Sequence, residues 1–166
     1  MIRHKVQNNM VFTRTFHVRD EWLAHRMGSG HVAVLATPAI VIAMENLAAS
    51  AIMPYLTEGS TSVGSRVDIV HLAPTPAGAY FSIELVVSKV EKNRIDFLMS
   101  AKEGTRTIAT GFHRRHVVDE AEFLASTMER DTTSVSSSDM DKPADMEQRQ
   151  TQVSLKVPFD DGDTRI

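Results

Sequence analysis

Cysteine is absent from this chain of 166 residues. A disulfide framework, a thiolate nucleophile and a zinc site built on cysteine are therefore excluded. The sequence also lacks an H-E-x-x-H motif and any pair of histidines four residues apart. We therefore expect no metal site and no cofactor. A chain without cysteine suits a reducing compartment.

Neither a strong charge excess nor an unbroken hydrophobic run is present. The net charge of -3 and the pI of about 6.1 provide no global attraction to nucleic acid or to anionic membranes. The first thirty residues contain no continuous apolar segment typical of a secretory signal. The longest apolar-rich stretch, Val32 to Met53, is interrupted by polar residues, which argues against a transmembrane span. We expect a cytoplasmic protein that binds neither nucleic acid nor membrane.

The length and composition fit one globular domain followed by a tail. We predict an N-terminal extension at residues 1–10, a domain at residues 11–123 and a mostly disordered polar tail at residues 124–166. Within the tail, Asp131 to Thr151 is rich in Ser, Thr, Asp and Gln, and disorder is expected there. Val153 to Phe159 alternates well enough to be a short strand or a docking segment.

A long helix is predicted from Thr37 to about Met53. Thr37 is a suitable N-cap, Pro38 fits the first helical position, and Pro54 ends the pattern. The residues between are apolar on nearly every side, which predicts a helix that is buried on most of its faces.

Strand patterns surround this helix. Val11 to Val18 alternates with a period of two, as a strand with one apolar face does. Four more strand-like runs follow the helix, separated by short Pro/Gly or polar turns: Ser62 to His71, Tyr80 to Val90, Arg94 to Lys102 and Thr105 to Val118. The pattern predicts an α+β fold in which one long central helix packs on a curved antiparallel sheet of about five strands. So small a sheet leaves an edge strand and a face uncovered, which favours a homodimer.

Glu45 is a carboxylate in the middle of the apolar helix, in a region with no Lys or Arg between Arg26 and Arg66. It either lies on a narrow solvent-facing stripe beside Asn46 or serves as a general base or nucleophile. A stripe one or two residues wide is unusual for a surface helix, so the functional interpretation is favoured.

Two further residues can border the same cleft. Thr37 precedes Glu45 by eight residues, which places them within roughly 80° of each other on the helix surface. At the helix start, Thr37 is either a simple N-cap or part of a site for a developing oxyanion. His71 ends a strand and is structural, exposed, or part of a proton-transfer set with Thr37 and Glu45. A basic cluster at residues 113–116 is either a solvated face or an anion contact.

These residues resemble the fluoroacetyl-CoA thioesterase family, a branch of the hotdog-fold thioesterases, over roughly Val11 to Phe123. The resemblance rests on motifs at matching intervals: Ala36-Thr37, Met44-Glu45, Met53 to Leu56, Gly64, His71 to Gly78 and Gly111 to Arg115. It implies a hotdog fold, hydrolysis of an acyl-CoA, and a dimer whose sheets meet edge to edge with the acyl-CoA site at the interface.

The resemblance also implies roles for particular residues. Thr37, Glu45 and His71 correspond to the catalytic set, and Gly64 and Arg115 to the residues that contact the substrate. The chain departs from the family before Thr37, where residues 28–32 include no aromatic lid, so fluoroacetyl specificity is not implied. Two other functions remain open: an acyl-CoA-binding sensor without activity, and an enoyl-CoA hydratase, whose Asp-His spacing is not found here.

Overall fold

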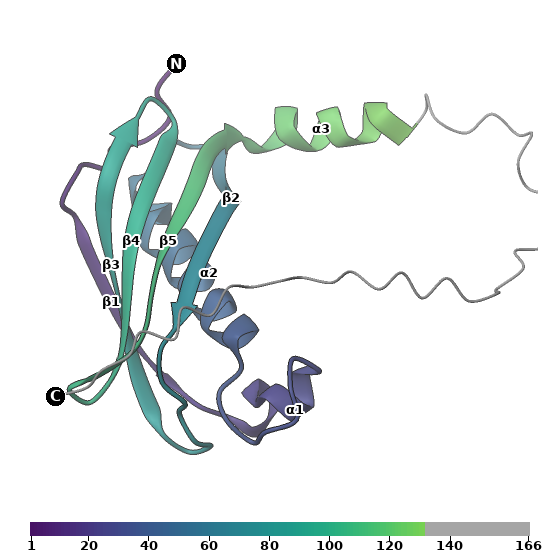
Figure 1. Cartoon of the computed structure of the whole chain (residues 1–166). Helices are drawn as coiled ribbons and strands as arrows, with labels where there is room; N and C mark the ends of the chain where they lie inside the picture. The colour runs from purple at the N-terminus through teal and green to yellow at the C-terminus, as the bar shows by residue number, and fades with distance from the viewer. Residues whose placement is uncertain (132–166) are drawn as a thin grey trace, which may run out of the picture.

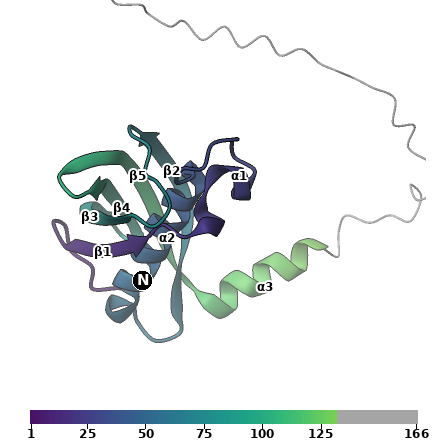
Figure 2. The same ribbon diagram turned by 90° about the horizontal axis from the view of Figure 1, so that it is seen from below.

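The computed structural model describes residues 1–131, which form one five-stranded antiparallel sheet curved around a central helix (Figures 1 and 2). The elements are β1 (Val11–His17), the 3-10 turn η1 (Asp20–Trp22), α1 (Ala24–Met27), α2 (Thr37–Ile52), the 3-10 turn η2 (Met53–Tyr55), β2 (Ser60–His71), β3 (Tyr80–Glu91), β4 (Arg94–Glu103), β5 (Arg106–Asp119) and α3 (Glu120–Asp131). The strand order is β1-β3-β4-β5-β2. The predicted fold class, central helix and five strands are confirmed.

Helix α2 is the centre of the hydrophobic core. Seven of its residues are buried against the sheet: Ala39, Ile40, Ala43, Met44, Leu47, Ala48 and Ile52. Figure 1 shows the helix lying along the inner face of the sheet. Within residues 1–131, it is the one helix that, extended through η2 to Tyr55, is long and apolar enough to cross a membrane. Its buried residues belong to the same core cluster as the inward-facing residues of the strands, as expected for the core helix of a globular domain.

Strand β2 lies at one edge of the sheet and contains a bulge. Gly64 pairs with Arg115 and Arg66 pairs with Arg114, so Ser65 has no partner on β5. Side chains alternate between the two faces of a strand, so residues seven apart, such as Gly64 and His71, would normally face opposite ways. The extra residue reverses this parity. Gly64 and His71 therefore both lie on the face that is covered by α2.

The N-terminal ten residues pack against the domain. His4 forms a β-bridge with Leu56, and its Nε2 lies 2.8 Å from the carbonyl oxygen of Lys92. Val6 is buried in the core, and Arg3 forms an ion pair with Asp119 at 3.1 Å. Residues 1–10, predicted as an extension, thus pack on the same domain as the sheet.

Residues 120–131 form helix α3, which leaves the domain beside β5 and β2 (Figure 1). Within the predicted tail at residues 124–166, residues 124–131 thus belong to a helix that the sequence patterns did not predict. The signal for this helix was local: the carboxylate of Asp119 accepts a hydrogen bond from the backbone N–H of Glu122, as in a helix cap. The predicted disorder after Asp131 and the predicted strand at Val153 to Phe159 lie outside the described residues.

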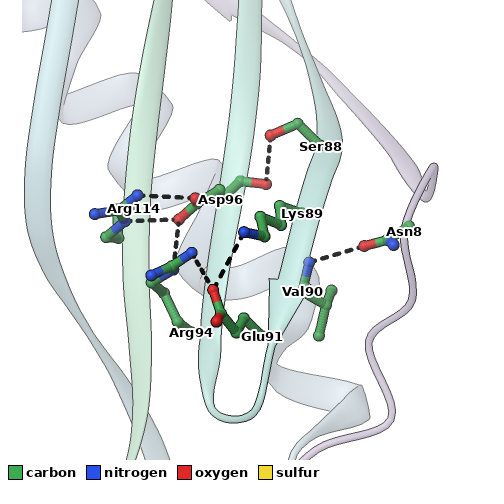
Figure 3. A network of polar contacts seen from close by, with 8 residues as sticks. All are labelled: Asn8, Ser88, Lys89, Val90, Glu91, Arg94, Asp96 and Arg114. Carbon is green, nitrogen blue, oxygen red and sulfur yellow. Dashed lines mark hydrogen bonds and ion pairs between the residues drawn. The ribbon is translucent and has the colours of Figure 1, made fainter.

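The outer face of the sheet carries a network of charged side chains centred on Asp96 (Figure 3). Arg114 of β5 donates two hydrogen bonds to the nearly buried Asp96 carboxylate, at 2.7 and 2.9 Å. Arg94 lies 3.6 Å from the same carboxylate and also pairs with Glu91. The hydrogen bonds from Arg114 hold the pKa of Asp96 below its ordinary value. The network joins β4 to β5 and braces the β3–β4 hairpin.

We predict that Asp96→Ala lowers the free energy of unfolding by about 2 kcal/mol, because a nearly buried bidentate pair is lost. Urea unfolding at neutral pH measures this. The pKa of Asp96 in the folded chain lies below 3.8, its ordinary value in an unfolded chain. The stabilisation that Asp96 provides is therefore complete above pH 3.8 and is lost as the pH falls through the pKa of the folded chain. The matched control is Asp68→Ala, whose carboxylate is exposed on β2 and should matter by less than about 0.5 kcal/mol. Equal effects of the two substitutions would contradict the role of Asp96.

Candidate active site

A hydrogen bond joins Thr37 to His71 where the start of α2 meets the end of β2. The Thr37 Oγ1 lies 2.9 Å from Nδ1 of His71. The other ring nitrogen, Nε2, lies 3.0 Å from the carbonyl oxygen of Ala73. A carbonyl only accepts, so Nε2 carries the proton and Nδ1 is the acceptor for the Thr37 hydroxyl. The arrangement is that of a hydroxyl paired with a basic imidazole, whose orientation is held by the main chain.

Thr37 does not cap the helix. The N-cap residue is Ala36, whose side chain makes no capping hydrogen bond. The prediction that Thr37 is the N-cap is therefore wrong, because its hydroxyl is engaged by His71, a residue that is distant in sequence. Pro38 has no N–H, and the N–H of Ala39 donates to the Ala36 carbonyl at 3.0 Å. Within residues 1–131, the amide of Thr37 is thus the donor that remains for an anion at this helix end.

Thr37 and His71 line an open pocket of about 340 Å³. Its other lining residues are Val34, Leu72, Ala73 and Pro74. Another hollow, of about 500 Å³, lies between β1, η1 and the far side of α2 and contains none of the predicted site residues. The pocket at the Thr37–His71 pair is therefore the one associated with the expected chemistry.

Glu45 lies two turns further along α2, against Gly64 of β2. A methyl group at position 64 would come within 2.6 Å of the Glu45 Oε1, so only a residue without a side chain lets the carboxylate approach this closely. The backbone of Gly64 is not in the left-handed region, which means that space and not conformation explains this glycine. The Glu45 side chain is 39% exposed in the single chain. It borders the exposed Asn46 and is not buried on all sides.

Two basic residues of β5, His113 and Arg115, face Glu45 from the sheet. Nε2 of His113 lies 3.9 Å from the Glu45 Oε1. Arg115 is nearly buried, and its guanidinium donates to Oγ and the carbonyl oxygen of Ser62 at 3.0 and 2.6 Å. Burial lowers the pKa of Arg115, whereas the negative charge of Glu45 acts in the opposite direction. The cationic partner that is missing from the helix sequence is supplied by a strand 70 residues later.

Sequence reasoning treated residues 113–116 as one basic cluster, and the structure divides it between the two faces of the sheet. His113 and Arg115 point inward and are buried, whereas Arg114 joins the outer network around Asp96. Period-two alternation along β5 was the signal that could have separated them. Ser62 is a site neighbour that the sequence did not single out, and His113 was singled out only as a member of the basic cluster.

The structure brings the five predicted site residues together as two groups on one inner face. Thr37 and His71 form the first group, and Glu45, Gly64 and Arg115 form the second. Among residues 1–131, no hydrogen bond or ion pair joins the two groups, which lie along α2 and β2 as these elements run past each other. A substrate that spans both groups would have to lie along this face.

The comparisons with known proteins agree with this geometry. The family model described as fluoroacetyl-CoA-specific thioesterase (FlK) matches residues 18–121, well over half of the chain. The chain belongs to this family. A fluoroacetyl-CoA thioesterase of Streptantibioticus cattleyicolor is 32% identical over 97 residues, covering 58% of this chain and 70% of the relative.

Solved structures support the same assignment. A structure of the fluoroacetyl-CoA thioesterase FlK superposes with a TM-score of 0.70 at 28% identity, covering 76% of this chain and 98% of that one. A thioesterase superfamily member from Thermus thermophilus superposes with a TM-score of 0.71 at 25% identity, over 77% and 95% of the two chains. The predictions of a hotdog fold, of this family and of a thioester hydrolase that acts on acyl-CoA are confirmed.

The contact between Glu45 and Gly64 generates a prediction for this family member. Gly64→Ala should displace the flexible Glu45 carboxylate, because the new methyl group would stand 2.6 Å from Oε1. We expect acyl-CoA hydrolysis to fall about tenfold or more in kcat/KM, while the unfolding midpoint changes little. The control is Gly30→Ala, where the nearest atom would be the Ala24 side chain at an ordinary 3.5 Å. A Gly64→Ala enzyme with full activity would show that the position of Glu45 is irrelevant to turnover.

Proposed function

We propose that this enzyme hydrolyses a small acyl-CoA to the free acid and CoA, using Thr37, Glu45 and His71. The observation that carries the proposal is the hydrogen bond between Thr37 and His71 at the mouth of an open pocket. The short acyl group of fluoroacetyl-CoA, the substrate named for a relative, favours a small acyl group here as well. Fluoroacetyl-CoA is the substrate named for the relatives, and the segment before Thr37 has no aromatic residue to act as the lid expected of that specificity.

Thr37 and His71 act on the thioester carbonyl and on the departing thiolate. The backbone N–H of Thr37 stands at the positive end of α2, where negative charge on the carbonyl oxygen is stabilised. With Nδ1 as its acceptor, His71 positions the Thr37 hydroxyl; in the water route it can instead take up the proton that the attacking water loses and give this proton to the departing CoA sulfur. The Ala73 carbonyl keeps a proton on Nε2, which leaves Nδ1 as the nitrogen that accepts.

The Glu45 carboxylate is either the base or the nucleophile of the reaction. It either removes a proton from water, which then adds to the carbonyl carbon, or attacks that carbon itself to form an anhydride that water later opens. Both routes break the same C–S bond and release the same acid. The close contact with Gly64 and the charge of Arg115 support a carboxylate held in one orientation. Hydrolysis in ¹⁸O-water separates the routes, because only the anhydride can place solvent oxygen in Glu45.

Gly64 and Arg115 form the acyl end of the site in this proposal. Gly64 leaves room beside the carboxylate, and Arg115 provides a cation close by. A buried cation of this kind suits an acyl group that carries a dipole or partial negative charge. No cofactor and no metal take part in the proposed reaction.

Glu45→Gln tests the mechanism most directly. The substitution retains volume and hydrogen bonding but removes the carboxylate, so kcat should fall about a hundredfold or more while acyl-CoA still binds. Thr37→Ala should also lower kcat and should leave the unfolding midpoint nearly unchanged, because Thr37 caps no helix. Release of free thiol from acetyl, propionyl, malonyl and aromatic CoA esters measures the rates, and urea unfolding measures stability.

The control is Asn46→Asp, which places a carboxylate on the same helix one residue away, where the native side chain accepts from Arg14. It should not rescue Glu45→Gln. Hydrolysis by Glu45→Gln at the parent rate would remove Glu45 from the mechanism. Binding of all the esters by the parent without turnover would favour an acyl-CoA sensor in place of an enzyme.

We further propose that the active form is a homodimer joined through β2, in the cytoplasm and independent of membranes and nucleic acid. Strand β2 is an edge strand of twelve residues that carries exposed apolar side chains at Val67 and Val70, and the exposed Leu72 directly follows it. An open edge of this length favours pairing with a second copy. The half-exposed Glu45 and the open pocket at Thr37 both lie beside this strand, so a second copy would cover them.

Val70→Lys tests the dimer. Val70 is 53% exposed on the outer face of β2, and two new lysines near a shared edge should repel. We expect the dissociation constant from sedimentation to rise about tenfold or more, with a parallel loss of activity at low protein concentration. The control is Leu98→Lys on the interior strand β4, where the native side chain is 55% exposed on the same face. A parent chain that sediments as an active monomer would overturn the proposed interface.

A further inference from the structure

His113 is a fully buried histidine that has no part in the proposed reaction. Its ring stacks on Phe97, with centroids 6.2 Å apart and planes 22° apart. Nδ1 lies 3.0 Å from the carbonyl oxygen of Arg66, and Nε2 lies 3.3 Å from an NH1 nitrogen of Arg115. Both ring nitrogens are therefore engaged, one by β2 and the other by the side chain next to Glu45.

These two contacts determine the protonation state of the ring. The Arg66 carbonyl can only accept, so the proton is on Nδ1. The guanidinium of Arg115 can only donate, so Nε2 must offer a lone pair. Both requirements are met by one species, the neutral Nδ1–H tautomer. A protonated ring would place a second cation against Arg115 and would remove its acceptor.

We propose that His113 is a positioning residue that, as a neutral imidazole, holds the Arg115 guanidinium in place beside Glu45 and Gly64. Ser62 holds the guanidinium from one side through Nε and NH2, and His113 holds NH1 from the other. The bond from Nδ1 to Arg66 ties the same ring to the residue that follows the bulge, so one side chain joins the acyl end of the site to the bulge that aligns Gly64 with His71. The inference rests on the proposed function, in which Arg115 and Glu45 form the acyl end.

The charges that face the ring come from both sides. Arg115 on its own strand disfavours the protonated ring, and Glu45 of α2 favours it. The largest influence is burial, which lowers the pKa of His113 below its ordinary value despite the bond to the Arg66 carbonyl. The ring is thus neutral over the physiological range, as the two hydrogen bonds require. On acidification, protonation of His113 should release Arg115.

Two amide substitutions separate the two bonds. An asparagine amide reaches roughly the position of Nδ1, so His113→Asn can still donate to Arg66 but cannot accept from Arg115. A glutamine amide reaches roughly the position of Nε2, so His113→Gln can still accept from Arg115. We expect kcat to fall about tenfold or more in His113→Asn and to stay within about threefold of the parent in His113→Gln, with KM for acyl-CoA little changed in both.

The control is His116, which lies three residues later on the same strand, opposite Arg94 and on the outer face. His116→Asn and His116→Gln should both leave kcat within about twofold of the parent. Nitrogen-15 spectra of the histidine rings in the full chain measure the tautomer directly and independently of activity. The His113 ring should appear as the neutral Nδ1–H form at pH 7.5, and its signal should be missing from His113→Gln.

The outcomes are distinguishable. A neutral Nε2–H tautomer or a protonated ring at pH 7.5 would overturn the proposal, as would equal losses of kcat in the asparagine and glutamine variants. If His113→Asn does not fold, two other results test the proposal: the tautomer of His113 in the parent and the kcat of His113→Gln. A parent chain that hydrolyses no acyl-CoA ester would contradict the proposed function, whereas the spectra would still report whether His113 holds Arg115 as described.

Discussion

The close approach of helix α2 to strand β2 at Gly64 is the constraint on which the site depends. The helix is apolar on most sides and packs into the curve of the sheet, which draws its single carboxylate toward the strands. A side chain at position 64 would force the Glu45 carboxylate to move, because a Cβ there would stand 2.6 Å from its Oε1. The missing side chain lets the carboxylate lie between the backbone of one strand and the basic residues of its neighbour. Hydrophobic packing thus holds α2 against the sheet, and the lack of a side chain at Gly64 leaves space for the Glu45 carboxylate.

The bulge at Ser65 is the second geometric condition. Without it, Gly64 and His71 would face opposite sides of the sheet, and only one of them could meet the helix. With it, the N-terminal turn of α2 meets His71 while the middle of the helix meets Gly64. Because of this one bulge, Gly64 and His71, seven residues apart, both contact α2 on the same face of the sheet.

Strand β5 serves both faces of the sheet with consecutive basic residues. Arg114 points outward, and the two hydrogen bonds that it donates to the Asp96 carboxylate stabilise the sheet. Arg115 points inward, where burial makes an unpaired charge costly and where Ser62, His113 and Glu45 surround it. The same residue type is structural on one face and close to the proposed chemistry on the other, and the difference is due to the alternation of the strand.

The sequence by itself determined the class of fold. Apolar residues that recur about every 3.6 positions indicate a helix, and those that recur every second position indicate a strand. Both patterns are local, so they predicted one long buried helix and five strands. It also indicated Glu45, because a carboxylate within an apolar helix is conspicuous at the level of composition. Helix α3 was missed although its cap, Asp119, is local, because the polar composition beyond it dominated the interpretation.

Other features were decided only by the tertiary structure. The hydroxyl of Thr37 had an obvious local partner in the helix backbone, yet His71, 34 residues later, takes it instead. The bulge at Ser65, the two directions of the basic cluster and the role of His113 as a contact of Arg115 all depend on strand pairing. Which residues of two distant strands lie opposite each other depends on how all the strands of the sheet are aligned. Which side chains meet across the site is therefore a property of the assembled sheet and helix, and not of any single segment.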